Sequence, residues 1–181
     1  LLDFAPPVGV LWVCWVILAG ILLYALTLPE APPVPLARDA QPIATILRQP
    51  KVIALMTACF AMSAAHGAFY VFYSIHLDAH GYSKTEVGLL WSLGVVAEIV
   101  VFMFMARLSR QFSLRAILLA SFGAAVIRFV LMGWGVESAA IMILVQLLHG
   151  LTFGAYHAAS IAAVNQWFPG RAQGRGQALY S

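Results

Sequence analysis

The amino-acid sequence predicts an all-α membrane protein with about five transmembrane helices and the start of a sixth. Of its 181 residues, 62% are hydrophobic and 9% are charged, which is more apolar side chain than a soluble domain of this size can bury. Five apolar stretches reach the length of about 20 residues that a helix needs to cross the bilayer core. All nine prolines lie outside the interiors of these stretches, as expected for helices that satisfy their own backbone in lipid. The composition excludes a disordered chain, and a net charge of +3 spread over this length gives no nucleic-acid surface.

The ends of the expected helices are marked in the sequence. No short basic segment precedes the first apolar stretch, which is therefore expected to be a membrane span and not a secretory signal. The third span starts where Ser83 and Glu86 have the spacing of a capping box. The chain begins without Met and stops inside its last expected helix, so we expect it to be an internal piece of a longer protein. The expected spans are residues 8–28, 52–75, 86–106, 114–133 and 138–163, followed by a helix that begins at Gly176.

Residues 29–50 differ from the other loops because they hold six of the nine prolines. Such a segment is stiff and extended, and it cannot be helical for long. We therefore expect residues 1–28 to be the last helix of one bundle, residues 29–50 to be a linker, and residues 51–181 to be part of a second bundle.

Basic residues alternate between the expected loops, with three in the first loop, one in the second, three in the third, none in the fourth and two in the fifth. Under the positive-inside rule, this pattern places the first, third and fifth loops, and with them the linker, in the cytoplasm. Trp91 and Trp134 then fall near the outer interface, as in an aromatic belt. The residues counted are Arg38, Arg48 and Lys51, then Lys84, then Arg107, Arg110 and Arg115, and finally Arg171 and Arg175.

Polar groups inside membrane spans need an explanation, because a charge at the bilayer centre costs about 2.5 to 3.5 kcal/mol or more. Glu98 lies in the middle of the third span, Arg128 lies in the fourth, and Gln146 and His149 lie near the middle of the fifth. Glu98 is interpreted as a carboxyl whose charge is switched by what binds nearby, or as a protonated acid that joins two helices. Arg128 is interpreted as the cation of the site, or as a side chain that extends to the membrane interface.

Two helices carry aromatic and polar side chains at helical spacing. His149, Phe153 and His157 recur every four residues in the fifth span, and His66 and Tyr70 do so in the second. Both rows are candidates to line one substrate cavity, and the alternative is ordinary hydrogen bonding between packed membrane helices.

Other chemistries have little support in the sequence. His66 and His76 are ten residues apart and His149 and His157 are eight apart, so neither pair has the i, i+4 spacing of a helical metal pair. No phosphate loop, nucleophile elbow or zinc-protease motif is present, so neither a metal nor a cofactor is expected. An intramembrane enzyme with His149 or His66 as its base is kept as the rival class.

Short motifs between Arg48 and Ser181 suggest a family when they are taken together. They are HGAFY at 66–70, GYSK at 81–84, GLLW at 88–91, AEI at 97–99, FPGR at 168–171 and GRGQALYS at 174–181. This combination resembles the C-terminal half of a major facilitator superfamily transporter, and more narrowly the phenylpropionate permease branch.

The resemblance implies two six-helix bundles, of which the N-terminal one is largely missing from this chain, in the inner membrane of a bacterium. It also implies a gating loop around Arg107, Arg110 and Arg115, although the usual acidic residue is replaced near Arg110 and the usual glycine is Ser113.

The chain also looks related to the lactose permease group, in which Glu, Arg and His on three successive helices form the substrate and proton site. Glu98, Arg128 and His149 match those positions, whereas the acidic residue that follows the histidine in that group is Thr152 here.

We therefore expect part of a proton-coupled symporter that carries a small aromatic carboxylic acid by alternating access, with the lipid bilayer, protons and the organic anion as its partners. Glu98, Arg128 and His149 are the expected coupling residues, and the alternatives are the intramembrane enzyme and a non-transporting helical remnant. The candidate substrate-binding residues are His66, Tyr70, Gln146, His149, Phe153 and His157.

Overall fold

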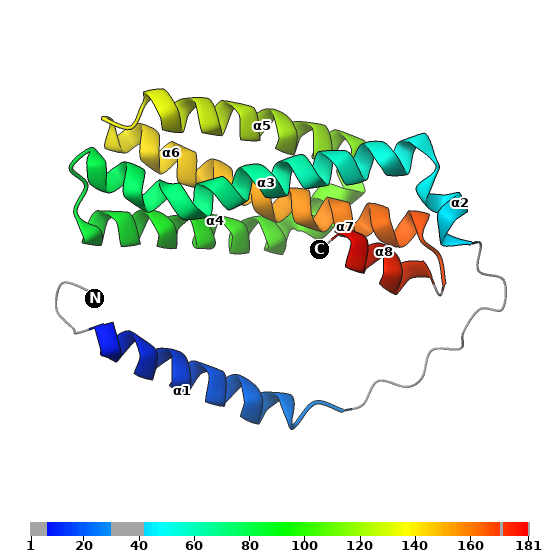
Figure 1. The fold of residues 1–181 in the computed structure, drawn as a ribbon, viewed down its shortest axis with the longest axis horizontal. Coiled ribbons are helices and arrows are strands. Elements are labelled where there is room, and N and C mark those ends of the chain that lie inside the picture. The colour runs from blue at the N-terminus through cyan, green and yellow to red at the C-terminus, as the bar shows by residue number, and fades with distance from the viewer. Residues whose placement is uncertain (1–6, 30–41, 171, 181) are drawn as a thin grey trace.

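The computed structural model describes residues 7–29, 42–170 and 172–180. The described residues form helices and turns only (Figure 1). The middle of the expected linker, with Arg38, and Arg171 of the last loop lie outside the described residues. The helices are α1 (Pro7–Ala25), α2 (Ile43–Leu47), α3 (Pro50–Ala79), α4 (Lys84–Gln111), α5 (Leu114–Trp134), α6 (Ala139–His149), the π-helix η1 (Gly150–Ala155), α7 (Tyr156–Trp167) and α8 (Ala172–Tyr180).

Five described helical segments are long and apolar enough to cross a membrane, which confirms the five expected spans. They are α1, α3, α4, α5 and the continuous run from α6 through η1 to α7. The helices from α3 to α7 lie side by side (Figure 1). The described side chains of α1 are almost all exposed. The predicted all-α membrane fold is therefore correct.

The helix ends follow from local capping. The Ser83 hydroxyl accepts a hydrogen bond from the Glu86 amide at 3.3 Å, and the Glu86 carboxylate accepts one from the Ser83 amide at 2.8 Å. This is the predicted capping box at the start of α4. At the other end of this turn, Gly81 has a φ of 84°, a left-handed conformation that ends α3 and that glycine adopts without strain.

Three segments differ from the sequence predictions. Ile46 of α2 is buried in the bundle core, so the last described part of the expected linker packs with the bundle. The last helix begins at Ala172 and not at Gly176, and Gly176 lies inside it, packed directly against the ring of Phe168. The fifth span contains the π-helix η1, which the sequence analysis did not predict.

The bundle core has two hydrophobic clusters with a polar layer between them. One cluster surrounds Leu55 and Tyr156, and the other surrounds Leu77 and Met142. On α3, buried His66 lies between Met62 of the first cluster and Phe69 of the second. The buried polar residues at this level are His66, Arg128, Gln146, His149 and Thr152.

Candidate functional site

Small residues bring α4 unusually close to the helix that carries the central histidine. A Cβ atom added to Gly150 would lie 2.5 Å from the Ala97 carbonyl oxygen, and one added to Gly154 would lie 3.5 Å from the Glu98 carbonyl oxygen. The contact at Gly150 leaves no room for a larger residue, so the backbones of α4 and η1 touch directly there. The close approach places Glu98 of α4 beside His149 at the end of α6.

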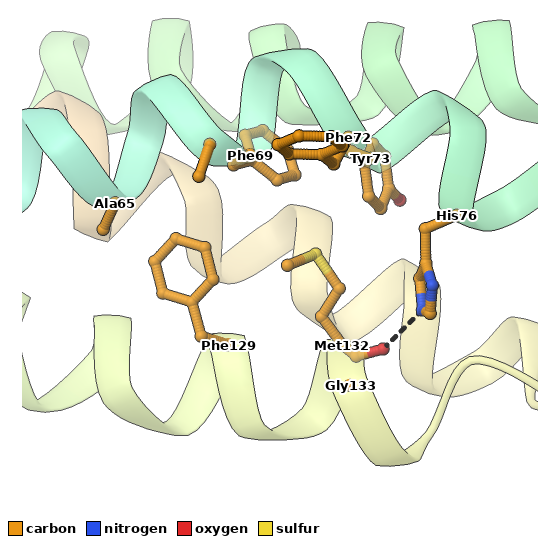
Figure 2. Close-up of a pocket in the computed structure, with 9 residues that line it drawn as sticks. Ala65, Phe69, Phe72, Tyr73, His76, Phe129, Met132 and Gly133 are labelled. Atoms are coloured by element: carbon orange, nitrogen blue, oxygen red, sulfur yellow. Dashed lines mark hydrogen bonds between the residues drawn. The ribbon is translucent and has the colours of Figure 1, made fainter.

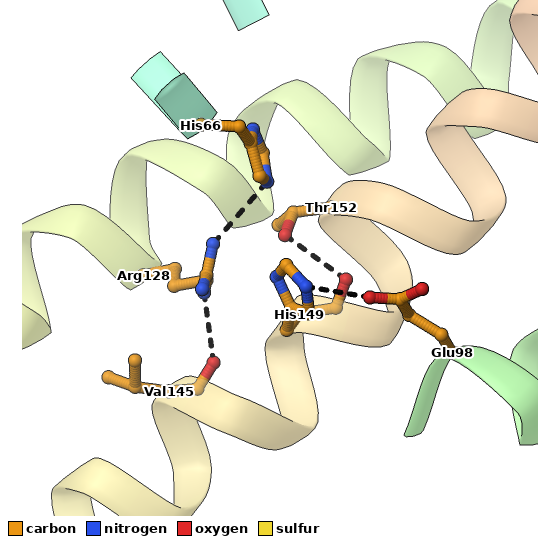
Figure 3. Close-up of polar contacts among 6 residues, drawn as sticks. All are labelled: His66, Glu98, Arg128, Val145, His149 and Thr152. Carbon is orange, nitrogen blue, oxygen red and sulfur yellow. Dashed lines mark hydrogen bonds and ion pairs between the residues drawn. The ribbon is translucent and has the colours of Figure 1, made fainter. Parts of the chain in front are cut away.

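Glu98 and His149 form an ion pair or a strong hydrogen bond. Their Oε1 and Nε2 atoms are 2.7 Å apart, and their side chains are 17% and 3% exposed (Figure 3). At this distance a proton lies between the two groups, on the imidazole when Glu98 is charged or on the carboxyl when it is neutral. No other salt bridge is found among the residues that the structure describes.

Arg128 points into the bundle, and the interpretation that it extends to the membrane interface is wrong. Its side chain is fully buried, with 0% exposed. The Nε atom donates to the Val145 carbonyl at 3.0 Å, and the guanidinium lies over the Phe69 ring with its carbon 4.1 Å from the ring centroid. Its Nη1 atom lies 3.5 Å from His66 Nε2 (Figure 3). These contacts replace part of the water that a charged guanidinium loses on burial.

Several buried polar atoms around Arg128 have no hydrogen-bond partner among the described residues. They are Arg128 Nη2, the His149 Nδ1 atom, both terminal atoms of Gln146, and the Tyr73 hydroxyl. Buried polar groups are nearly always paired, and an unpaired one costs about 1 to 3 kcal/mol. Their concentration in one layer therefore points to water or a polar ligand as the absent partner.

The π-helix η1 aligns the aromatic row of the fifth span. In a regular α-helix, each residue turns by about 100°, so the eight positions from His149 to His157 would leave them about 80° apart. A π-turn accommodates one extra residue and so removes about one step of this rotation. Phe153 consequently stacks on both histidine rings, with interplanar angles of 22° to His149 and 3° to His157.

His157, on α7, is the last residue of this aromatic row, and its ring contacts α8. Its Nδ1 atom lies 2.7 Å from the Tyr180 hydroxyl. A pocket of about 220 Å³ beside this pair is lined by His66, Phe153, Tyr156, His157 and Tyr180, together with Met62 and Ser63. The structure thus brings the predicted residues His66, Phe153 and His157 to one pocket.

The facing wall is formed by aromatic residues of α3 and α4. Tyr70 is 45% exposed, and its ring stacks on Trp91 with an interplanar angle of 18°. The Trp91 indole donates to Ser74 at 2.9 Å, so this residue belongs to the aromatic cluster and not only to an interface belt. Sequence reasoning left Trp91 and Tyr180 out of the site, although Trp91 lies seven residues before Glu98 on the same face of α4.

A second pocket between α3 and α5 has a different character (Figure 2). Its volume is about 390 Å³, and its lining is almost entirely apolar, with Phe69, Phe129 and Met132 among the residues that form it. The His76 ring at its edge hydrogen-bonds the Met132 carbonyl at 3.3 Å. No described Lys or Arg side chain lines this pocket to pair with a carboxylate, so the polar layer is the better candidate site.

The expected gating-loop residues lie apart from this layer. Arg107 and Arg110 lie in the last turns of α4, Arg115 lies in the first turn of α5, and all three are exposed. In the described part of the chain, none of them forms a salt bridge.

Comparisons with known proteins agree with this architecture. Residues 1–181 match the family described as "MFS_1 like family", and the chain belongs to this family of the major facilitator superfamily. The chain is also similar to the probable 3-phenylpropionic acid transporter of Escherichia coli strain K12, with 42% identity over 105 residues. The aligned part covers 58% of this chain and 27% of that transporter, so the match spans only part of a longer protein. No solved structure matches the chain.

The predicted resemblance to the phenylpropionate permease branch is thereby confirmed. The chain is an integral membrane protein of a transporter family, which favours transport over enzymatic activity.

Proposed function

We propose that this chain is part of a proton-coupled symporter that carries a small aromatic carboxylic acid across the inner membrane of a bacterium. The family and the name of the relative support transport of such an acid. The alternation of basic residues between loops supports an orientation with the linker and the α4–α5 loop in the cytoplasm.

One observation carries the proposal: a fully buried arginine with a free donor lies in the same layer as a carboxyl–imidazole pair. Arg128 is 0% exposed, and its Nη2 atom has no partner among the described residues. The Glu98 Oε1 and His149 Nε2 atoms are 2.7 Å apart. A buried guanidinium is suited to bind a carboxylate, and a carboxyl in contact with an imidazole is suited to gain and lose a proton.

The substrate carboxylate is proposed to bind at Arg128. Water or a carboxylic acid can form hydrogen bonds with three groups there: the Nη2 donor of Arg128, the Gln146 amide and the His149 Nδ1 atom. The ring of the substrate would lie against aromatic side chains, which favour offset or edge-to-face contacts. The proposed aromatic lining is His66, Tyr70, Phe153 and His157.

Glu98 is proposed to be the proton acceptor. The resemblance to the lactose permease group implies an acidic residue one turn after the histidine, but Thr152 stands there in this chain. The Thr152 hydroxyl donates to the His149 carbonyl at 3.3 Å, and a hydroxyl cannot replace a carboxyl as proton acceptor. Within the polar layer, Glu98 is then the carboxyl available to take up a proton, with His149 as its partner.

Transport would follow alternating access, in which this bundle and the N-terminal bundle close around the polar layer from one side or the other. Residues 1–28 are proposed to belong to that first bundle and residues 51–181 to the second. The exposed basic residues Arg107, Arg110 and Arg115 are proposed to act at the cytoplasmic contact between the bundles.

The test is uptake of radiolabelled 3-phenylpropionate by membrane vesicles that contain the full-length protein, with an imposed inward proton gradient. The wild type should accumulate the unmodified acid and lose this accumulation with an uncoupler. Glu98→Gln should abolish accumulation, because an amide keeps the side-chain shape but carries no exchangeable carboxyl proton. Glu137→Gln is the matched control, since Glu137 is exposed in the α5–α6 loop.

Two results would contradict the proposal. Unchanged accumulation by Glu98→Gln would remove Glu98 from coupling. Recovery of a chemically altered product inside the vesicles would support the intramembrane enzyme instead.

A further inference from the structure

His66 has a different position from the other two histidines of the layer. It lies on α3 and is 3% exposed, with one ring nitrogen directed to its own helix and the other to Arg128 on α5. Its Nδ1 atom is 3.0 Å from the Met62 carbonyl oxygen, and its Nε2 atom is 3.5 Å from Arg128 Nη1.

These two partners determine where the ring proton resides. A carbonyl oxygen only accepts hydrogen bonds, so Nδ1 must carry the hydrogen that reaches Met62. A guanidinium only donates, so Nε2 must present its lone pair to Arg128. With both nitrogens assigned, the His66 ring is neutral, and a proton added at Nε2 would face a cation.

The same contacts fix the orientation of the guanidinium. Its Nε atom is held by the Val145 carbonyl of α6, its face by the Phe69 ring of α3, and its Nη1 atom by His66. The atom left without a partner is Nη2. Removal of the His66 acceptor would let the guanidinium rotate and turn Nη2 away from the layer.

We propose that His66 is a positioning residue: it accepts a hydrogen bond from Arg128 and thereby aims the Nη2 donor at the substrate carboxylate, without carrying the transported proton. This inference rests on the proposed function, and it assigns to His66 a role distinct from that of His149. His149 contacts a carboxylate and has its Nδ1 atom free, whereas both nitrogens of His66 are engaged.

The titratable groups around His66 come from every packed element. The guanidinium of Arg128 faces it from α5, and the ring of His149 faces it from α6 at a centroid distance of 5.7 Å. Tyr70 lies one turn along α3 with its centroid 6.2 Å away. The pocket of about 220 Å³ beside His66 also contains Tyr156, His157 and Tyr180. Glu98 is separated from this ring by its pairing with His149.

Two amide substitutions test the acceptor directly. In His66→Gln, the longer side chain can place its amide oxygen where Nε2 stands, so it can still accept from Arg128. In His66→Asn, the shorter side chain reaches only the Nδ1 position, so the acceptor is lost. We expect His66→Asn to raise the KM for 3-phenylpropionate about tenfold. His66→Gln should restore the KM to within about threefold of wild type.

The pH profile separates positioning from proton transfer. The pH dependence of the maximal uptake rate should be the same in wild type, His66→Asn and His66→Gln, with protein levels in the membrane matched by immunoblot. A shifted pH profile in His66→Asn with an unchanged KM would overturn the inference. An equal rise of the KM in His66→Asn and His66→Gln would also overturn the inference, because the loss of the hydrogen-bond acceptor would then not explain the weaker substrate binding.

A second readout does not depend on transport. In ¹⁵N-histidine-labelled wild-type protein, the signal absent from His66→Gln should report a neutral ring protonated at Nδ1 from about pH 5 to about pH 8. Titration of that signal within this range would refute the inference. If the wild type fails to accumulate the acid while this signal stays neutral, the proposed function fails, whereas the hydrogen bond from Arg128 to a neutral His66 stands.

Discussion

Arg128 shows how one residue keeps a full charge within an apolar bundle. An isolated charge at the bilayer centre is costly, so the guanidinium needs partners that replace water. Here its partners are the Val145 carbonyl of α6 and the rings of Phe69 and His66 of α3. The three partners hold the planar group in one orientation and leave Nη2 open. A lysine could keep the charge but could not satisfy this set, because it has one flexible ammonium.

At this scale we predict that Arg128→Lys raises the KM for 3-phenylpropionate by about tenfold or more, since a charged fork becomes a point charge that no longer reaches Val145. The measurement is concentration-dependent uptake in vesicles. Arg48→Lys is the control, because Arg48 is exposed at the end of α2 and should tolerate the change. An unaltered KM in Arg128→Lys would mean that the carboxylate binds elsewhere.

The sequence predicted which residues belong to the candidate site, but it did not predict their orientation. Glu98, Arg128 and His149 stand out because ionisable groups are rare in membrane spans. The direction of Arg128 was left open, because its long side chain can reach either the interface or the core. The signal that settles it is the spacing of small residues: Ser121, Ala124 and Ala125 share the buried face of α5 with Arg128.

At the scale of the element, the fifth span depends on its π-turn and its glycines. Gly150 and Gly154 let η1 touch α4, and the extra residue of the π-turn keeps His157 under His149. Hydrophobic runs predict that this helix exists, but a π-turn has the same composition as an α-helix and was not predictable. The start of α8 was missed for a related reason, because Gly174 and Gly176 disfavour a helix locally and tertiary packing on Phe168 overrides them.

We predict that Gly150→Ala lowers stability by about 1 to 3 kcal/mol, the range for an overpacked contact, and reduces proton-driven uptake. The added methyl would lie 2.5 Å from the Ala97 carbonyl oxygen, so α4 must move and Glu98 must separate from His149. The melting temperature of the purified protein checks the first effect, and vesicle uptake checks the second. Gly123→Ala is the matched control, because a methyl there meets no atom within 4 Å. Equal behaviour of the two variants would argue against the close approach.

The π-turn gives a second prediction at this scale. Deletion of Leu151 should convert η1 to regular α-helix and leave His149 and His157 two turns apart on one face, so folding should survive. Insertion of one alanine after Leu151 should turn α7 by about a further 100° and separate His157 from Tyr180. The melting temperatures of the two variants are compared. Equal damage from deletion and insertion would show that the π-turn does not set the alignment.

At the scale of the whole molecule, the bundle places one polar layer between two hydrophobic clusters. Leu55 and Tyr156 belong to one cluster, and Leu77 and Met142 to the other. The layer is thus shielded along the bundle axis by apolar side chains, which strengthens the electrostatic contacts inside it. Span lengths and proline positions predicted the five membrane helices, but the pairing of helices came only from the structure, because apolar runs alone do not determine which faces meet.

The orientation of the bundle can be tested by thiol labelling. In a chain without Cys14 and Cys59, we predict that a membrane-impermeant maleimide labels Glu137→Cys in intact cells. Gln111→Cys, at the exposed end of α4, should be labelled only after permeabilisation. The reverse pattern would show that the positive-inside assignment is wrong.

The most direct test of the shared polar layer compares two modes of transport in Glu98→Gln. Exchange of labelled for unlabelled 3-phenylpropionate requires substrate binding and movement of the bundles but no net proton transfer. Accumulation against a gradient requires net proton transfer as well. If Glu98 is the coupling carboxyl beside an intact Arg128 anion site, Glu98→Gln retains exchange and loses proton-driven accumulation. Retained accumulation, or the loss of exchange together with accumulation in a correctly inserted protein, would contradict this division of roles between Glu98 and Arg128.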